Sequence, residues 1–244
     1  MSFVHSKATD VYVNGVDITT FLSKATSSKM VDKAETSCFG ATYKAYVPGL
    51  TDAQLTLEGY FDGTASAIDA QLQALLANDT SLFTLLPIGD AASNPGTSFL
   101  GWESSYNILS DITAAVKVAM TAESKTGAVP IIIGEPKTTF NAVATTFTPT
   151  YDTALAPTTA GGELHYHVFA LTGTGSPTVT LSWQTSPDGS AWTTIATSGA
   201  ISTAPSYGRI VVAPGVTIDV QSRIAIVRGG STISTTVFAA THRN

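Results

Sequence analysis

The stretch 178-TVTLSWQTSPDGSAWTTI-195 decides the fold class. Its apolar residues Val179, Leu181 and Trp183 alternate with polar residues, which is the period of a β-strand with one buried face. A Pro-Asp-Gly turn at 187–189 follows, and the chain returns through a second strand. Because Trp183 has the phase of Val179 and Leu181, we expect it in the core of a β-structure.

The same alternation continues on both sides of this hairpin. Apolar residues recur at period two along 164–170, 216–220, 224–226 and 233–237. Glycine and proline separate these runs at spacings near ten residues. This cadence predicts at least six short strands packed as a sandwich or a barrel.

The first part of the chain also reads mostly as strands. Val11 and Val13 lead into Asn14-Gly15, the strongest short signal for a β-hairpin. Period-two patterns over 55–61 and 116–121 predict two further strands.

One helix interrupts this pattern. Ile68, Leu72, Leu75 and Leu76 stand at i, i+4, i+7 and i+8, which forms a single apolar stripe on a helix. We expect this stripe to pack on a sheet.

Charge divides the chain into two regions. Residues 1–135 contain seven lysines, no arginine and 14 acidic residues, whereas residues 136–244 contain one lysine, four arginines and four acidic residues. The change coincides with a turn-rich passage that begins near Pro136. We therefore predict an N-terminal domain over 1–135 and a C-terminal domain over 136–244.

The composition excludes several classes of protein. With 43% hydrophobic and only 12% charged residues, the chain is not typical of a disordered protein. Its surface is covered either by small polar residues or by other subunits, and we favour burial against other subunits. Cys38 is the only cysteine, so we expect no intrachain disulfide. We also expect no signal peptide and no membrane insertion, because the apolar runs are too short.

The sequence shows no motif for catalysis. Glu163, His165 and His167 would share one face of a strand, so a metal site can be drawn, but no supporting partner is identifiable. Asp32 and Glu35 lie in a polar stretch that suits a solvated loop or a subunit contact better than acid and base catalysis. We predict a protein that is not an enzyme and that has no catalytic residues, no metal and no cofactor.

The sequence also bears on two kinds of ligand, nucleic acid and glycan. Nucleic-acid binding is disfavoured because the acidic first region would repel a phosphate backbone. Trp183 belongs to the core, which leaves Trp192 and Tyr207 as the aromatic residues that could contact a glycan.

Residues 11-VYVNGVDITTFLSKATSSKMVDKAETSCFGATYKAYVPGLTDAQLTLEGYFDG-63 and the helix 67-AIDAQLQALL-76 resemble the tail tube (major tail) protein of long-tailed bacteriophages. The shared features are a strand before a G-V-D-I turn, an acid-rich passage over 32–40, a P-G-L segment before a strand, and then the helix. The resemblance covers about 125 residues. The stretch 178–195 is similar in style to immunoglobulin-like or carbohydrate-binding-like virion modules. The fold expected from this resemblance is mainly β: an N-terminal tail-tube-type sandwich or barrel with one flanking helix, followed by a C-terminal β-sandwich.

The resemblance implies a structural virion protein that polymerises as stacked hexameric rings into the conduit for DNA ejection. Its partners would be further copies of itself and other tail proteins, namely the tape measure, tail tip and tail terminator proteins. Genome DNA would pass through without specific binding, and the protein would be assembled in the host bacterial cytoplasm and located in the virion tail. We expect the loop 31–40, with Asp32, Lys33, Glu35 and Thr36, to make contacts between subunits.

The alternative is a virion decoration or adhesion protein. In that case the C-terminal sandwich would bind surface glycans, and the first region would serve only as an anchor.

Overall fold

The computed structural model describes residues 6–38, 42–62, 68–76, 78–113, 115–151 and 156–244. The chain divides into two compact units, and each unit is built from separate stretches of sequence. Unit 1 comprises Met1–Thr19, Leu82–Ser98 and Val129–Asn244, and unit 2 comprises Thr20–Ser81 and Phe99–Ala128. The described residues are mainly β, as predicted, and α1 (Ile68–Gln73) is the one α-helix among them.

Unit 1 contains two antiparallel sheets. The larger follows the order β13-β10-β15-β8-β6-β5-β1-β2, and the smaller the order β12-β11-β14-β9. Their strands are β1 (Asp10–Val13), β2 (Val16–Asp17), β5 (Ser81–Leu86), the first four residues of β6 (Pro95–Leu109), β8 (Val129–Phe140), β9 (Thr145–Phe147), β10 (Gly162–Thr174), β11 (Thr178–Ser186), β12 (Thr193–Thr197), β13 (Ser206–Val212), β14 (Gln221–Gly229) and β15 (Thr232–Arg243). A short 3-10 helix, η1 (Ser6–Ala8), precedes β1.

The smaller sheet packs on part of the larger one and forms a sandwich. Alternate residues of β10 and β11 enter its core, including Leu164, Val168, Leu181 and Trp183. Trp183 is fully buried, as its phase predicts, and its indole N–H donates to Ser222 Oγ at 3.1 Å. The core is thus formed by the period-two alternation that is visible in the sequence.

The opposite face of β10 lies in a second core. The β2 end of the larger sheet curls back towards β10. This approach is shown by the backbone N–H of Gly15, between β1 and β2, which donates to Nδ1 of His167 on β10 at 3.0 Å. Gly15 has φ +78°, and a Cβ there would lie 2.7 Å from the carbonyl oxygen of Ser206, so this approach requires glycine. The larger sheet therefore curls around a second core, which includes Tyr12 and Phe238. The Asn14-Gly15 hairpin is confirmed by the pairing of β1 with β2.

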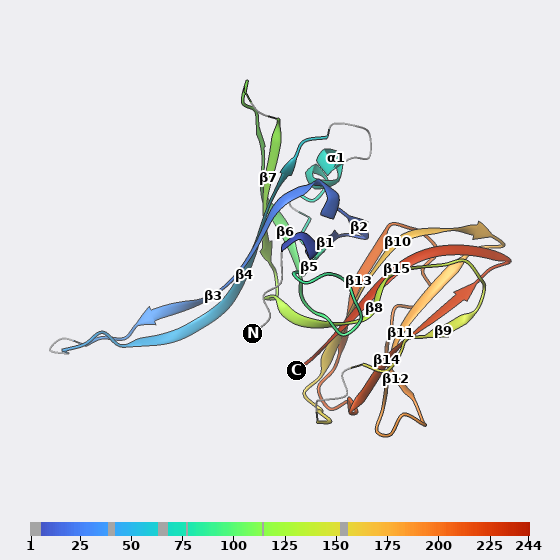
Figure 1. Ribbon diagram of the computed structural model, residues 1–244. Coiled ribbons are helices and arrows are strands. Elements are labelled where there is room, and N and C mark those ends of the chain that lie inside the picture. Colours follow the sequence, from blue (N-terminus) through green and yellow to red (C-terminus); the bar gives the residue numbers. More distant parts are fainter. Residues whose placement is uncertain (1–5, 39–41, 63–67, 77, 114, 152–155) are drawn as a thin grey trace. The chain divides into compact units, whose positions relative to one another are not determined.

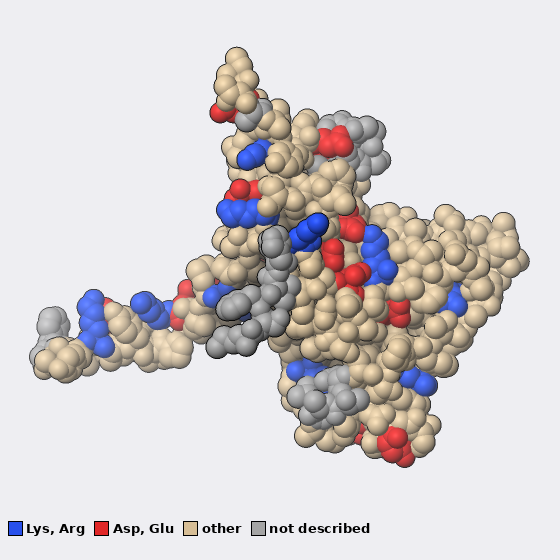
Figure 2. Space-filling view, viewed as in Figure 1, with Lys and Arg blue, Asp and Glu red and all other residues tan. Residues whose placement is uncertain are grey.

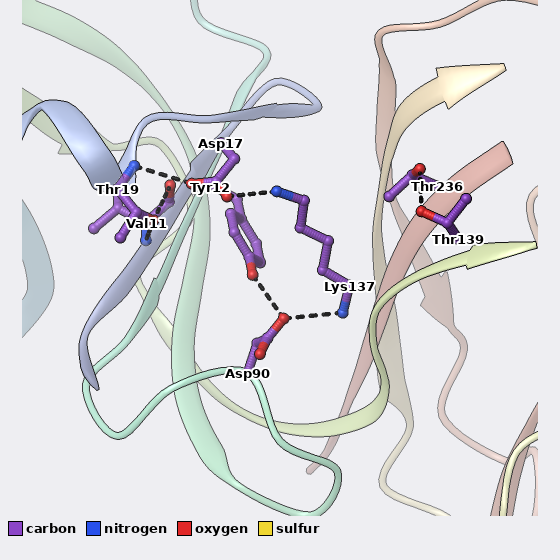
Figure 3. Close-up of polar contacts among 8 residues, drawn as sticks. All are labelled: Val11, Tyr12, Asp17, Thr19, Asp90, Lys137, Thr139 and Thr236. Atoms are coloured by element: carbon purple, nitrogen blue, oxygen red, sulfur yellow. Dashed lines mark hydrogen bonds and ion pairs between the residues drawn. The ribbon is translucent and has the colours of Figure 1, made fainter.

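Polar contacts fix the β1–β2 hairpin to β8 (Figure 3). Lys137 Nζ donates to Asp17 at 2.6 Å, while the Lys137 backbone N–H and the Tyr12 hydroxyl both donate to Asp90. Burial raises the pKa of Asp17, but hydrogen bonds from Lys137 and Thr19 outweigh this effect and lower it below its usual value. Asp17 is therefore held as an anion beside the lysine.

Unit 2 is a sheet in the order β3-β4-β7-β6, with α1 in the connection after β4. Its elements are η2 (Thr19–Phe21, whose first residue belongs to unit 1), β3 (Leu22–Glu35), β4 (Tyr46–Tyr60), α1, the rest of β6, and β7 (Lys117–Ser124). Leu72 and Leu75 of the predicted stripe are buried, but Leu76, which lies three residues beyond the end of α1, is about half exposed. The stripe prediction is therefore right for two of its leucines and wrong for Leu76; the side chain of Ile68 lies outside the described residues.

Two other expectations meet a different local structure. The segment 216–220 was predicted as a strand, but it forms only one isolated bridge, between Ile218 and Thr158. The predicted boundary near residue 135 falls inside β8. The assignment of domains to 1–135 and 136–244 remains a prediction.

Candidate functional site

The distal part of the β3–β4 hairpin stands out because it has no further strand beside it. β7 pairs with β4 only from Gln54 to Tyr60, so among the described strands residues 46–53 of β4 have β3 as their one neighbour. β3 likewise pairs with β4 alone. We call the described residues 29–38 and 42–52 the arm, and Figure 1 shows them as a long two-stranded ribbon. Within the described ranges, neither outer edge of the arm pairs with a further strand.

Both faces of the arm carry exposed apolar side chains. Cross-strand partners share a face, so the register places Met30 and Val47 on one face and Val31 and Tyr46 on the other. Met30 and Val47 are each 52% exposed. Tyr43, between the strands, is 85% exposed. Neither face of the arm is therefore buried by the described part of the chain.

A β-bulge interrupts the middle of the arm. The pairing shifts between Val31 and Lys33, which leaves Gly49 and Leu50 opposite Asp32. Leu50 is 82% exposed. The bulge thus adds another apolar side chain to the solvent-exposed surface of the arm.

The four residues predicted for subunit contacts lie together on the arm. Asp32, Lys33 and Glu35 belong to β3, and Thr36 follows directly, so the expectation of a loop is wrong for residues 31–35. The strand over these residues was not predicted, because a ribbon that is exposed on both faces lacks the alternation of apolar and polar residues by which strands are identified. Gly40, the end of that predicted loop, lies outside the described residues.

Weak local contacts hold the arm. Glu35 pairs with Lys44 at 3.3 Å, both exposed, and Lys33 Nζ lies 4.9 Å from the centre of the Tyr46 ring. Exposed pairs of this kind contribute about 0–1 kcal/mol, and an isolated two-stranded hairpin is marginally stable. In Figure 2 the arm shows separate lysine and acidic patches on a mostly uncharged surface. Its length and apolar exposure fit a segment that is completed by a partner.

The tip of the β6–β7 hairpin is a second exposed apolar surface, which we did not predict. Ile108 and Leu109 are half exposed, and Ile112 is fully exposed. Together with neighbouring residues, Ile108 and Leu109 line an open hollow. The apolar residues over 108–112 are a signal that could have identified it.

The two aromatic residues proposed for glycan contact lie on different sheets. Trp192 precedes β12 of the smaller sheet, whereas Tyr207 belongs to β13 of the larger sheet. Both side chains are half-buried. A role for either in glycan binding remains a prediction.

The residues from which a metal site could be drawn are buried and hydrogen-bonded. Glu163, His165 and His167 share one face of β10, as predicted. Because Gly15 N donates to His167 Nδ1, the proton of the neutral ring is on Nε2, which donates to Thr84 Oγ1 at 2.9 Å. Burial lowers the pKa of His167 to about 3, so the ring is neutral at pH 7. His167 is therefore a buried, neutral side chain of the second core of unit 1.

The Glu163 side chain, on the same face of β10, is paired with Arg209 and His165. Its carboxylate accepts hydrogen bonds from Arg209 and lies 2.8 Å from His165 Nε2. Burial raises its pKa, but the hydrogen bonds from Arg209 and His165 outweigh burial and hold the pKa at about 2. Burial also lowers the pKa of His165, against the opposing effect of Glu163. The arrangement is a buried ion pair, which sequence reasoning did not identify.

Two searches of the described residues found nothing. No group of three or more histidine, cysteine, aspartate or glutamate side chains in these ranges is placed to hold a metal ion. Within the same ranges, no helix has the length and apolar character needed to span a bilayer.

Comparisons with known proteins give weak structural likenesses. No protein-family model matches the chain, and no curated protein matches it. The Dit protein of phage SPP1, described as a hub of the adsorption apparatus in phages that infect Gram-positive bacteria, is 13% identical over 96% of this chain and 98% of its own, with a TM-score of 0.40.

Two other similar structures are chains of larger particles. One, from the virion of a native gene transfer agent, is 11% identical over 52% of this chain and 97% of its own, with a TM-score of 0.40. The other, from the sheath–tube complex of an extracellular contractile injection system, is 14% identical over 52% of this chain and 90% of its own, with a TM-score of 0.41. At these scores and identities, nothing about the function of this chain follows from the likenesses.

Proposed function

We propose that this chain is a structural subunit of a bacteriophage tail, namely the tail tube subunit that polymerises as stacked hexameric rings around a DNA conduit. The observation that carries the proposal is the arm, a ribbon with two unpaired edges and exposed apolar side chains on both faces. A long exposed strand edge is a template for pairing with another chain, and proteins that remain monomeric block such edges.

The partner that we propose for the arm is another copy of this chain. The arm contains three lysines and three acidic residues, so two copies can meet without net repulsion. Lys33 and Glu35 stand on the same face, where opposite charges of a neighbouring arm could alternate with them. Burial of the apolar residues would contribute roughly 25 cal/mol for each Å² removed from water. The low charged fraction of 12% suits a surface that is covered in an assembly.

The proposed conduit must let DNA pass without holding it. The first 135 residues contain no arginine and have twice as many acidic residues as lysines. A wall of this composition would release few counterions from DNA and would bind it weakly. Tape measure, tail tip and tail terminator proteins are the further partners we propose, with assembly in the host cytoplasm and a location in the virion tail. We propose no enzymatic activity.

The first experiment disrupts one face of the arm. Met30→Asp combined with Val47→Asp places two charges on that face, and the matched control is Val143→Asp combined with Val216→Asp, two exposed valines of unit 1. Mass photometry and negative-stain microscopy should find wild-type and control rings of six times 25.2 kDa, or tubes, and an arm variant that stays monomeric. Circular dichroism should be the same for all three proteins.

The exposed Cys38 offers an independent readout, because it is the only cysteine and lies on the arm. A maleimide dye on Cys38 should change its emission when wild-type chains assemble. Equal assembly of the arm variant and the wild type would refute the role of the arm. A wild-type chain that stays monomeric up to its solubility limit would contradict self-assembly and favour the decoration protein.

The second experiment tests the charged residues of the arm. Asp32→Asn together with Glu35→Gln should reduce the tube yield and leave the monomer folded, because the charges lie at the proposed contact. Lys33→Gln and Thr36→Ala are single variants for the same contact. A wild-type tube yield from the Asp32 and Glu35 double variant would refute this contact.

A further inference from the structure

The smaller sheet of unit 1 presents a clamped arginine on its outer face. The guanidinium carbon of Arg223, on β14, lies 4.0 Å from the centre of the Phe147 ring and 4.1 Å from the centre of the Trp192 ring. The two rings thus hold the planar cation by cation–π contacts. Burial against these rings lowers the pKa of Arg223, although a guanidinium remains charged at neutral pH.

Each part of this clamp is itself fixed. Arg223 Nε donates to Gln184 Oε1 at 2.8 Å, and the Gln184 amide donates in turn to Thr194 Oγ1 at 3.1 Å. Trp192 Nε1 donates to the Gly189 carbonyl in the β11–β12 turn at 3.0 Å. Strand pairing of β9 with β14 positions Phe147.

The ends of the guanidinium are unoccupied. In the described part of the chain neither Nη atom of Arg223 has a hydrogen bond, and no carboxylate lies within ion-pair distance of it. Asp188, in the adjacent turn, accepts hydrogen bonds from Ser190 instead. A guanidinium that is already oriented can bind a carboxylate through two parallel N–H···O bonds, and little side-chain entropy remains to be lost.

Small hydroxyl groups surround the clamp. On β11 and β12 the outer face continues with Ser182 and Thr197, whose hydroxyls are hydrogen-bonded at 3.2 Å. Thr194 and Thr197 are exposed. Such a surface offers donors and acceptors to sugar hydroxyls.

We propose that Arg223, held between Phe147 and Trp192, is the anion-binding centre of a site for acidic carbohydrate, with the guanidinium binding the sugar carboxylate. In this site Trp192 holds the Arg223 side chain in place, and Tyr207 is not part of the site. It lies within unit 1 and is independent of the arm, so it does not depend on self-assembly.

The test measures binding of glucuronate oligosaccharides to the full-length protein by isothermal titration calorimetry. Neutral glucose oligosaccharides of the same length are measured for comparison. Binding of the acidic series at least tenfold tighter than the neutral series is expected. Arg223→Met should weaken acidic binding at least tenfold. Arg223→Lys should weaken it several-fold, because an ammonium group keeps the charge and loses the two parallel bonds.

Two aromatic variants form a matched pair. Trp192→Ala should weaken binding, whereas Tyr207→Ala should leave it unchanged, and all variants should melt as the wild type does. Equal affinity for acidic and neutral sugars, or no binding of the acidic series at millimolar concentration, would overturn the proposal. Equal affinity for a glutamate-rich peptide would also overturn it, because the site would then recognise carboxylates of proteins. Loss of ring formation in Arg223→Met would contradict the independence of the site from assembly.

Discussion

Glu103 is a buried carboxyl group in unit 2, and its removal should change how stability depends on pH. The side chain is only 2% exposed, and neither carboxylate oxygen has a hydrogen-bond partner among the described residues. It pairs across the sheet with Ala122 of β7, which is itself buried and faces Leu55 of β4. Burial raises the pKa of Glu103 to about 8, so the group is mostly protonated in the folded protein at neutral pH.

The magnitude follows from the two pKa values. In the unfolded chain the carboxyl group has a pKa of 4.5, against about 8 when folded. Because the folded state binds the extra proton, its stability is greatest below the unfolded pKa and falls as pH rises towards the folded pKa. At about 1.4 kcal/mol for each pH unit, the loss across this window is roughly 5 kcal/mol.

The variant Glu103→Gln keeps the shape of the side chain and cannot ionise. Urea unfolding is followed by circular dichroism at about pH 5.5 and about pH 8. Between these two pH values the stability of the wild type should fall by roughly 3 kcal/mol relative to that of Glu103→Gln, because the buried histidines contribute equally to both proteins. The matched control Glu123→Gln, in β7 of the same sheet, should follow the wild type. Identical pH dependence of Glu103→Gln and the wild type would refute the reasoning.

The remaining predictions concern stability. Lys137→Met removes the partner of Asp17 and should cost about 1 kcal/mol at pH 7; the effect should fade as acid protonates Asp17 at low pH, which denaturation at several pH values would reveal. Gly101→Ala would place a Cβ 2.0 Å from the carbonyl oxygen of Glu123, so it should cost about 1–3 kcal/mol in a thermal melt. Trp183→Ala empties the sandwich core and should cost about 3–5 kcal/mol, and an unchanged unfolding midpoint would contradict this.

Sequence patterns predicted the elements in which one face is buried. Trp183 and Leu72 could be placed because burial imposes a period on the neighbouring residues. The arm could not be recognised as a pair of strands, since both of its faces meet solvent and no burial period exists. Its residues Asp32 and Glu35 were nevertheless singled out by their polarity and by the family resemblance.

The burial of charged side chains was not predicted, for a different reason. Glu103 has the phase of the buried residues Phe99 and Gly101, but a charged residue in a strand is ordinarily assigned to the solvent face. The pairing of Glu163 with Arg209 depends on which strands become neighbours, and strand order is not contained in local periodicity. The clamp around Arg223 joins three segments far apart in the sequence and was missed for the same reason.

The contacts that bring the first hairpin of unit 1 against later strands set an order for folding during synthesis. Gly15 is bonded to a residue 152 positions later, and Asp17 to one 120 positions later, so the first hairpin leaves the ribosome long before its partners exist. The chain of unit 2 is complete once Ala128 has been made. β15, the final strand of unit 1, lies between β10 and β8. A chain that stops before Thr232 would therefore lack an interior strand, and such long-range closure folds slowly.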